Sequence, residues 1–271
     1  NNNIAQVTSL AVAESPGDVY NPLFIYGGVG LGKTHLIQSI GNFVLKNNPS
    51  AKVLYTTSES FTNEVIDLLR KKKTNQEEII EFRKKYRSVD VLLIDDIQFI
   101  SGRDRTQEEI FNIFNDLFMK HKQIVLTSDK KPKDMEGIAE RLINRFEQGL
   151  TVDIQNPDYE TRMAILKKKA ETSGYNIDEG VLQYIANHFV SNVRELEGSL
   201  TRVITFSKIS HSPITVDFAS GVLQELVAPN QENAITCEYI INIVADHFQI
   251  SPTDICSKKK SREFAYPRQI C

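Results

Sequence analysis

The chain has 271 residues, 41% of them hydrophobic and 25% charged, which is ordinary for a globular protein with a sizeable core. No apolar run approaches the length of about 18 residues that a membrane helix needs, and no signal peptide opens the sequence. We therefore expect a cytoplasmic protein without stable membrane insertion. The net charge of −3 does not indicate nucleic-acid binding, so any such activity must come from local basic patches. The three cysteines lack metal-ligand spacing and suit a reduced compartment.

A glycine-rich stretch at residues 27–34, GGVGLGKT, matches the phosphate-binding pattern G-x-x-x-x-G-K-[ST]. It lies between a predicted buried strand at 23–26 and a predicted helix at about 34–44. Glycines let backbone N–H groups turn toward phosphate oxygens, and the helix adds its positive end. The pattern predicts Lys33 at the β- and γ-phosphates and the Thr34 hydroxyl on Mg²⁺; the alternative is a turn that binds nothing. The residues expected around the nucleotide are Gly28, Val29, Gly30, Leu31, Gly32, Lys33, Thr34 and His35.

Up to about residue 154, short apolar runs alternate with helical patterns, which is typical of a parallel α/β sheet. A helix is expected from the start of the chain to Glu14. Further strands are expected at 52–57, 91–96, 123–129 and 151–154, and further helices at about 58–73, 76–87, 105–120 and 138–146. The apolar side of the helix at 58–73 is formed by Phe61, Val65, Ile66, Leu68 and Leu69.

The run VLLIDD at residues 91–96 predicts a central buried strand with two carboxylates at its C-terminal end. Open α/β sheets place their ligands at that end. In P-loop ATPases this position is the Walker B motif, where Asp95 would hold Mg²⁺ and Asp96 would orient or activate the attacking water. A turn or a helix cap is the alternative for two aspartates after a strand.

Two other polar features have open interpretations. Asp129 ends the predicted strand at 123–129 and either senses the γ-phosphate or belongs to a turn. Arg141 and Arg145 are four residues apart and therefore share a helix face, which becomes informative if that face meets a neighbouring subunit's nucleotide.

After residue 157 only helices are expected, at about 158–169, 178–189, 193–209 and 215–226, with Asp158 and Asp178 as N-caps. A polar linker at 229–233 precedes an amphipathic helix at 236–248, a helical turn at 251–256 and a basic loop, KKKSR, at 258–262. Both ends of the sequence have the character of a chain cut inside a longer protein.

The phosphate loop, the Walker B run and the helical lid together resemble AAA+ ATPases. Three stretches resemble the DnaA family of bacterial replication initiators: NPLFIYGGVGLGKTHL at 21–36, YRSVDVLLIDDIQF at 86–99 and SNVRELEG at 191–198. The resemblance covers the chain from about residue 11 onward. It implies an AAA+ α/β domain over 1–157 with a five-stranded parallel sheet in the order 5-1-4-3-2, and an all-helical lid over 158–228. Residues 229–271 would form a linker helix and the incomplete start of a helix-turn-helix DNA-binding domain.

The same resemblance implies roles for single residues. Asp129 matches the sensor 1 position, and Arg194 matches the sensor 2 arginine of the lid. Arg145 matches the arginine finger and Arg141 its neighbour, both serving an adjacent subunit.

The resemblance also implies DNA contacts. Ile66 and Arg105 match single-strand contacts, although Ile66 could equally be a core residue and Arg105 an ordinary exposed residue. Lys260, Arg262 and Arg268 match duplex-contacting positions, with Lys260 where the family usually has an arginine.

The function implied is ATP-dependent initiation of chromosome replication, in which the ATP form oligomerises on origin DNA and slow hydrolysis switches it off. ATP or ADP and Mg²⁺ are the expected cofactors. Single- and double-stranded origin DNA and other copies of the chain are the expected partners. Helicase and regulators, reached through domains outside this sequence, and acidic phospholipids are further ones. A helicase loader without origin recognition is the main alternative, and a P-loop metabolic kinase is a weaker one.

Overall fold

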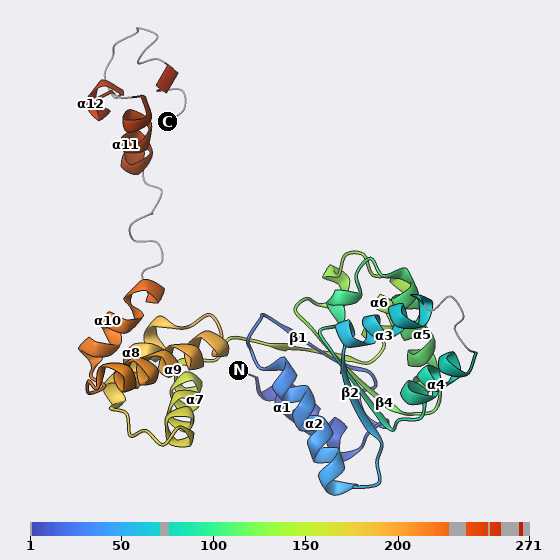
Figure 1. The fold of residues 1–271 in the computed structure, drawn as a ribbon. Helices are drawn as coiled ribbons and strands as arrows, with labels where there is room; N and C mark the ends of the chain where they lie inside the picture. The colour runs from blue at the N-terminus through green and yellow to red at the C-terminus, as the bar shows by residue number, and fades with distance from the viewer. Residues whose placement is uncertain (1, 71–75, 228–236, 249, 256–265, 268–271) are drawn as a thin grey trace. The chain divides into compact units, whose positions relative to one another are not determined.

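The computed structural model of the chain describes residues 2–70, 76–227, 237–248, 250–255 and 266–267 (Figure 1). Its contacts divide it into two compact units, residues 1–201 and 202–271, which are described separately below. This geometric division differs from the domain boundaries after residues 157 and 228 that the sequence suggests, and those boundaries stay a prediction.

The first unit is built on a five-stranded parallel sheet in the order β2-β3-β4-β1-β5. The predicted order 5-1-4-3-2 is confirmed, and each strand lies within one or two residues of its predicted range. The strands are β1 (Leu23–Gly27), β2 (Val53–Thr57), β3 (Val91–Asp95), β4 (Gln123–Ser128) and β5 (Leu150–Ile154). β3 and β4 lie inside the sheet and are buried along their whole length, as the apolar run of β3 predicts.

Helices cover both faces of this sheet, and alternate strand residues contact opposite layers (Figure 1). On one face, Leu93 and its odd-numbered neighbours pack against α1 (Asn3–Glu14) and α2 (Lys33–Asn47). On the other, Leu92 and Ile94 pack with the remaining helices of the layer. These are α3 (Ser58–Arg70), α4 (Gln76–Arg87), α5 (Asp104–Met119) and α6 (Glu140–Glu147), with the short 3-10 turns η1 (Ile97–Ile100) and η2 (Pro132–Asp134).

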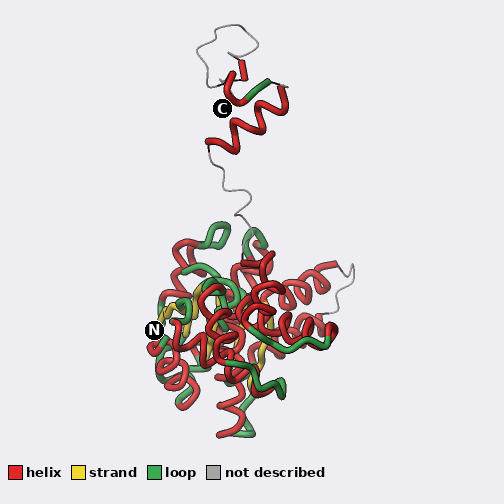
Figure 2. The backbone as a smooth tube through the Cα atoms, turned by 90° about the vertical axis from the view of Figure 1, so that its left-hand side faces the viewer, coloured by secondary structure: helices red, strands yellow, loops and turns green. Residues whose placement is uncertain are grey.

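Every element described after β5 is a helix, as predicted (Figure 2). These are α7 (Tyr159–Thr172), α8 (Glu179–His188), α9 (Val193–Ser210), α10 (Val216–Val227), α11 (Cys237–Phe248) and α12 (Pro252–Ile255). Asp158 and Asp178 are the predicted N-caps, since their carboxylates accept backbone N–H bonds from Thr161 and Gly180. In the second unit, α11 and α12 share a small apolar cluster. No helix of the described chain combines the length and the apolar composition that crossing a bilayer requires.

The prediction for one apolar residue of α3 is wrong. Leu69 was expected on the apolar side of its helix, but it is 61% exposed, whereas Phe61 and Val65 of the same helix are buried against Phe82 and Tyr86. Leu69 lies in the last turn of α3, next to the final residue of that helix. Periodicity identifies the face of a helix but not where along its length the covering elements stop.

Helix α2 packs closely on β3 because the large side chain of Leu93 lies opposite a glycine, Gly41, which has no side chain. Leu93 is 1% exposed, and a Cβ added to Gly41 of α2 would lie 2.8 Å from its Cδ1 atom. We predict that Leu93→Ala lowers the free energy of unfolding by about 3 kcal/mol, because removal of the leucine side chain leaves a cavity between α2 and the sheet. Urea unfolding followed by circular dichroism measures this loss.

Leu69→Ala removes the same atoms from an exposed site and is the matched control. It should change the free energy of unfolding by no more than about 0.5 kcal/mol. Equal losses in the two variants would contradict the assigned core.

Candidate nucleotide-binding site

The phosphate loop joins the end of β1 to the start of α2. Gly30 and Gly32 have φ angles of 75° and 93°, in the left-handed region that favours glycine. Gly32 is the N-cap residue of α2, and Lys33 is its first residue. The loop therefore leads into the N-terminus of α2, where the helix dipole favours an anion.

The Lys33 side chain is held at the centre of this loop. It is only 6% exposed, and its Nζ atom donates to the carbonyl oxygens of Gly27 at 2.8 Å and Gly28 at 2.9 Å. It also donates to Asp129 Oδ1 at 2.5 Å, in an ion pair. The structure thus brings two predicted site residues, Lys33 and Asp129, into contact.

Asp95 is 2% exposed, and both of its carboxylate oxygens accept hydrogen bonds. Thr127, at the end of β4, donates to Oδ1, and the Tyr55 hydroxyl of β2 donates to Oδ2 at 2.9 Å. The Thr127 Oγ1 atom also accepts the backbone N–H of Asp96 at 2.8 Å. The two strands that flank β3 therefore fix the predicted metal ligand from both sides.

Asp96 turns away from the strand with a left-handed φ of 56°. Its Oδ1 accepts from Gln98 Nε2 at 3.3 Å, and the same nitrogen donates to Asp129 Oδ2 at 3.1 Å. Burial raises the pKa of Asp96, the Gln98 hydrogen bond opposes that rise, and the nearby negative charges of Asp95 and Asp129 add to it. A raised pKa makes this carboxylate a stronger base for a proton from water.

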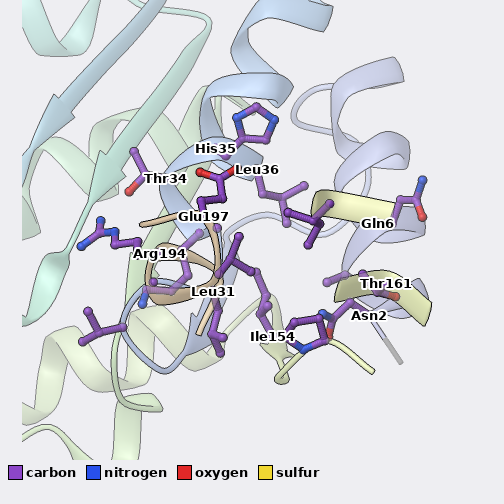
Figure 3. A pocket seen from close by; sticks show the side chains of 18 of the residues that line it. Asn2, Gln6, Leu31, Thr34, His35, Leu36, Ile154, Thr161, Arg194 and Glu197 are labelled. Atoms are coloured by element: carbon purple, nitrogen blue, oxygen red, sulfur yellow. The ribbon is translucent and has the colours of Figure 1, made fainter. Parts of the chain in front are cut away.

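A cavity of about 1280 Å³ opens over the phosphate loop. Pockets for drug-sized ligands hold roughly 300–1000 Å³, so this one has room for a nucleoside triphosphate. Its lining includes Lys33, Thr34, Asp96, Asp129 and Arg194 together with the rest of the predicted loop from Val29 to His35. In Figure 3, Thr34 and Arg194 lie at one side of the pocket, and Asn2, Gln6 and Thr161 lie at the other.

The start of α9 is in direct contact with the phosphate loop. The Val193 backbone N–H donates to the Gly30 carbonyl at 3.0 Å. A Cβ on Gly30 would lie 3.0 Å from Asn192 Oδ1 and 3.2 Å from Arg194 Cγ. Arg194, predicted from the lid motif, therefore comes to the cavity beside a loop position where an added Cβ would be tightly packed.

Arg141 and Arg145 share a face of α6, as their spacing predicts. Their guanidinium carbons lie 4.6 Å and 5.9 Å from the ring centroids of Phe111 and Phe118 on α5. Arg145 also donates to Gln148 Oε1 at 2.7 Å. Neither arginine is among the described residues that line the cavity.

The predicted DNA-contacting residues lie elsewhere. Ile66 on α3 is half-buried and is not part of the buried core cluster. Arg105 on α5 is 76% exposed and pairs with Glu108 at 3.2 Å. The helices α3 and α5 contact each other. Lys260, Arg262 and Arg268 lie outside the described residues.

The predicted metal ligands are oxygen donors, the kind of ligand that Mg²⁺ prefers. The described residues contain no group of three or more His, Cys, Asp or Glu side chains that could hold a metal by itself. Mg²⁺ bound with a nucleotide needs only one or two protein oxygens beside phosphate and water. The Thr34 hydroxyl lines the cavity. The Asp95 carboxylate is not among the described residues that line it and lies buried at the end of β3. The two side chains are oxygen donors of the kind that Mg²⁺ takes.

The sheet order, the phosphate loop and the helical segment after it define an AAA+ P-loop ATPase fold. The model of the bacterial DnaA ATPase domain matches residues 1–153, and that of the bacterial DnaA helix-turn-helix matches residues 237–271. The chain therefore belongs to the DnaA family.

Individual relatives agree with this assignment. The chain is 55% identical over 270 residues to the chromosomal replication initiator protein DnaA of Lachnoclostridium phytofermentans, covering 100% of this chain but only 59% of that relative's length. The crystal structure of domain III of DnaA from Thermotoga maritima is 42% identical with a TM-score of 0.78, over 84% of this chain and 93% of that one. A structure of DnaA bound to AMPPCP and single-stranded DNA is 34% identical with a TM-score of 0.70, covering 99% of this chain and 76% of that one.

Sequence reasoning missed several residues of this site. Tyr55, Gln98 and Thr127 contact the two predicted carboxylates, yet none belongs to the phosphate-loop or Walker B pattern. Thr127 could have been found as a hydroxyl at the C-terminal end of a buried strand. The chain offers no comparable signal for Tyr55, which lies in the middle of β2 and not at its end.

We predict that Gly30→Ala weakens nucleotide binding at least about tenfold. A side chain at φ 75° costs about 1–2 kcal/mol and would press on Asn192 and Arg194. Titration with a fluorescent adenine nucleotide measures the affinity.

Gly174→Ala is the matched control, because Gly174 has a φ of 73° and open space around its added Cβ. It should have the same backbone cost and leave nucleotide affinity unchanged. Equal affinities in wild type and Gly30→Ala would contradict the importance of this contact.

Proposed function

We propose that this chain is the ATPase part of an ATP-switched initiator of chromosome replication. The observation that carries the proposal is that Lys33, Asp129, Asp96 and Arg194 line one cavity over the phosphate loop in a member of the DnaA family. Since the chain spans 59% of its curated relative, the activity of the whole protein belongs to this proposal. A cytoplasmic location belongs to it too, because the initiator acts on the chromosome.

The nucleotide is bound mainly by the loop. Backbone N–H groups of residues 28–35 hold its phosphates, Lys33 binds the β- and γ-phosphates, and Thr34 and Asp95 hold Mg²⁺. When bound, Mg²⁺ neutralises charge that develops on the phosphate oxygens. Asp96 takes a proton from the attacking water, a role that its raised pKa favours.

Two residues report the state of the γ-phosphate within the same subunit. Asp129 binds both Lys33 and Gln98, and Gln98 in turn binds Asp96. A γ-phosphate that competes with Asp129 for Lys33 would therefore change the hydrogen bonds of Asp129 and Gln98, and through them that of Asp96. Arg194 brings a second positive charge to the cavity from α9, as a sensor 2 arginine does.

Arg145, with Arg141 beside it, completes the site of an adjacent subunit. Both sit outside the cavity of their own subunit, on a helix face where they stack on aromatic rings. A guanidinium donates two hydrogen bonds to phosphate oxygens and stays charged. ATP then joins neighbouring subunits, and ADP, which lacks the γ-phosphate, releases them.

DNA is the proposed macromolecular partner. One similar structure is described as a DnaA bound to AMPPCP and single-stranded DNA. Ile66 and Arg105 are the proposed single-strand contacts, from helices that touch each other. Lys260, Arg262 and Arg268 are the proposed duplex contacts of the helix-turn-helix segment. Helicase, regulators and acidic phospholipids complete the proposed set of partners.

A helicase loader without origin recognition is the alternative function. The match of residues 237–271 to the DnaA helix-turn-helix model favours the initiator, because a loader has no use for that segment.

We predict that Asp96→Asn binds ATP with an affinity close to wild type but hydrolyses it at least about 100-fold more slowly, since the amide accepts no proton. Release of phosphate and a nucleotide titration measure the two properties. Lys33→Ala is the contrasting variant, and it should lose binding itself. Hydrolysis at the wild-type rate in Asp96→Asn would reject Asp96 as the base.

We predict that Arg145→Ala keeps ATP affinity and loses ATP-dependent self-association. Analytical ultracentrifugation of the chain with ATP, ADP or no nucleotide, with and without single-stranded DNA, tests this and the switch together. Wild type should assemble with ATP and bind the DNA more tightly than it does with ADP, with an affinity that falls as salt rises.

The control is Arg105→Ala. It removes an exposed arginine from α5, whereas Arg145 is on α6. It should assemble with ATP in the absence of DNA and bind DNA more weakly. Normal assembly of Arg145→Ala would refute the finger, and equal DNA binding with ATP and ADP would refute the switch.

A further inference from the structure

The Asp95 carboxylate lies between two hydroxyl groups that come from opposite neighbours of its strand. Tyr55 is on β2 and Thr127 is on β4, and β3 pairs with both strands. Each hydroxyl donates to a different oxygen of Asp95. Residues 91, 93 and 95 point to the sheet face that α2 covers, so this carboxylate faces the helix that follows the phosphate loop.

Two donors on two oxygens fix the rotation of a carboxylate. A carboxylate has about four lone-pair sites, and these hydrogen bonds use two of them. One lone pair on each oxygen stays available for a metal. A single donor would leave the group free to turn about its Cβ–Cγ bond, whereas the pair holds one plane.

We propose that Tyr55 and Thr127 are positioning residues, whose hydroxyls hold the Asp95 carboxylate in one orientation for Mg²⁺. The inference rests on the proposed role of Asp95 as a metal ligand. In known metal sites, groups that hydrogen-bond a ligand set its orientation, and their loss costs about 10–100-fold in metal affinity or activity.

Tyr55 provides this hydrogen bond from the edge of the sheet. β2 is an edge strand of the sheet, and Tyr55 is 36% exposed while Asp95 is 2% exposed. The Tyr55 phenol O–H is a hydrogen-bond donor at neutral pH and donates to Asp95 Oδ2 at 2.9 Å.

Thr127 provides the hydrogen bond from the centre of the sheet and is fully buried. Its hydroxyl donates to Asp95 and accepts from the Asp96 backbone N–H at 2.8 Å. One side chain therefore fixes the metal-binding carboxylate and the backbone of the proposed base together. Loss of the hydroxyl should disturb both.

The test uses Tyr55→Phe and Thr127→Val, which each remove a hydroxyl with little change of shape. ATP affinity is measured by fluorescence in EDTA and over a range of Mg²⁺ concentrations. We expect unchanged affinity in EDTA and about a tenfold rise in the Mg²⁺ concentration that gives half of the metal's effect. Thr127→Ser restores a hydroxyl and should restore the wild-type response.

Tyr86→Phe is the matched control, because the buried Tyr86 hydroxyl donates to Glu64 at 3.0 Å, on the other face of the sheet. It should respond to Mg²⁺ as wild type does. Thermal unfolding without nucleotide separates positioning from stability.

These measurements distinguish a positioning role of the two hydroxyls from a structural one. A wild-type Mg²⁺ response in Tyr55→Phe and Thr127→Val would overturn the positioning role alone. Loss of ATP affinity in EDTA, or failure of Thr127→Ser to restore the response, would also overturn it, since the hydroxyls would then be structural. If ATP binding by the wild-type chain ignored Mg²⁺, the proposed metal role of Asp95 would fall, and the positioning role with it.

Discussion

The parallel pairing of β1, β3 and β4 is the constraint on which the rest of this structure depends. Parallel strands end at the same edge of a sheet, and here the order β3-β4-β1 places three polar loop starts side by side. The phosphate loop follows β1, the two acidic residues lie at the end of β3, and Asp129 follows β4. Segments far apart in the chain thus meet at one edge of the sheet.

Burial of charge at this edge sets the demands on the surrounding side chains. An ionised group taken out of water is costly unless hydrogen bonds replace the water. Lys33 and Asp95 are each buried, and each is satisfied by several partners: two carbonyls and Asp129 for the lysine, two hydroxyls for the aspartate. The same partners that make burial tolerable also fix orientation, which connects stability to the proposed chemistry.

The sequence predicted most of the fold and the centre of the site. The caps and helix ranges follow from local patterns, whereas the strand order was implied by the resemblance to the DnaA family. The phosphate loop and Asp95 follow from motifs whose spacing is set by one strand and one turn. Leu69 shows a limit of prediction from local patterns, because its exposure depends on where the neighbouring helices end. Tyr55 shows it too, because its bond to Asp95 joins strands separated by two helices in the chain.

By itself, the sequence determined that a nucleoside triphosphate loop is followed by an acidic strand end, and that only helices come after the sheet. These are local properties, fixed by residue type and short spacing. Only the tertiary structure decided which residues meet across the sheet: Thr127 between the two aspartates, Gln98 between Asp96 and Asp129, and the start of α9 against Gly30. Such contacts depend on strand register and helix packing, which no short stretch of residues encodes.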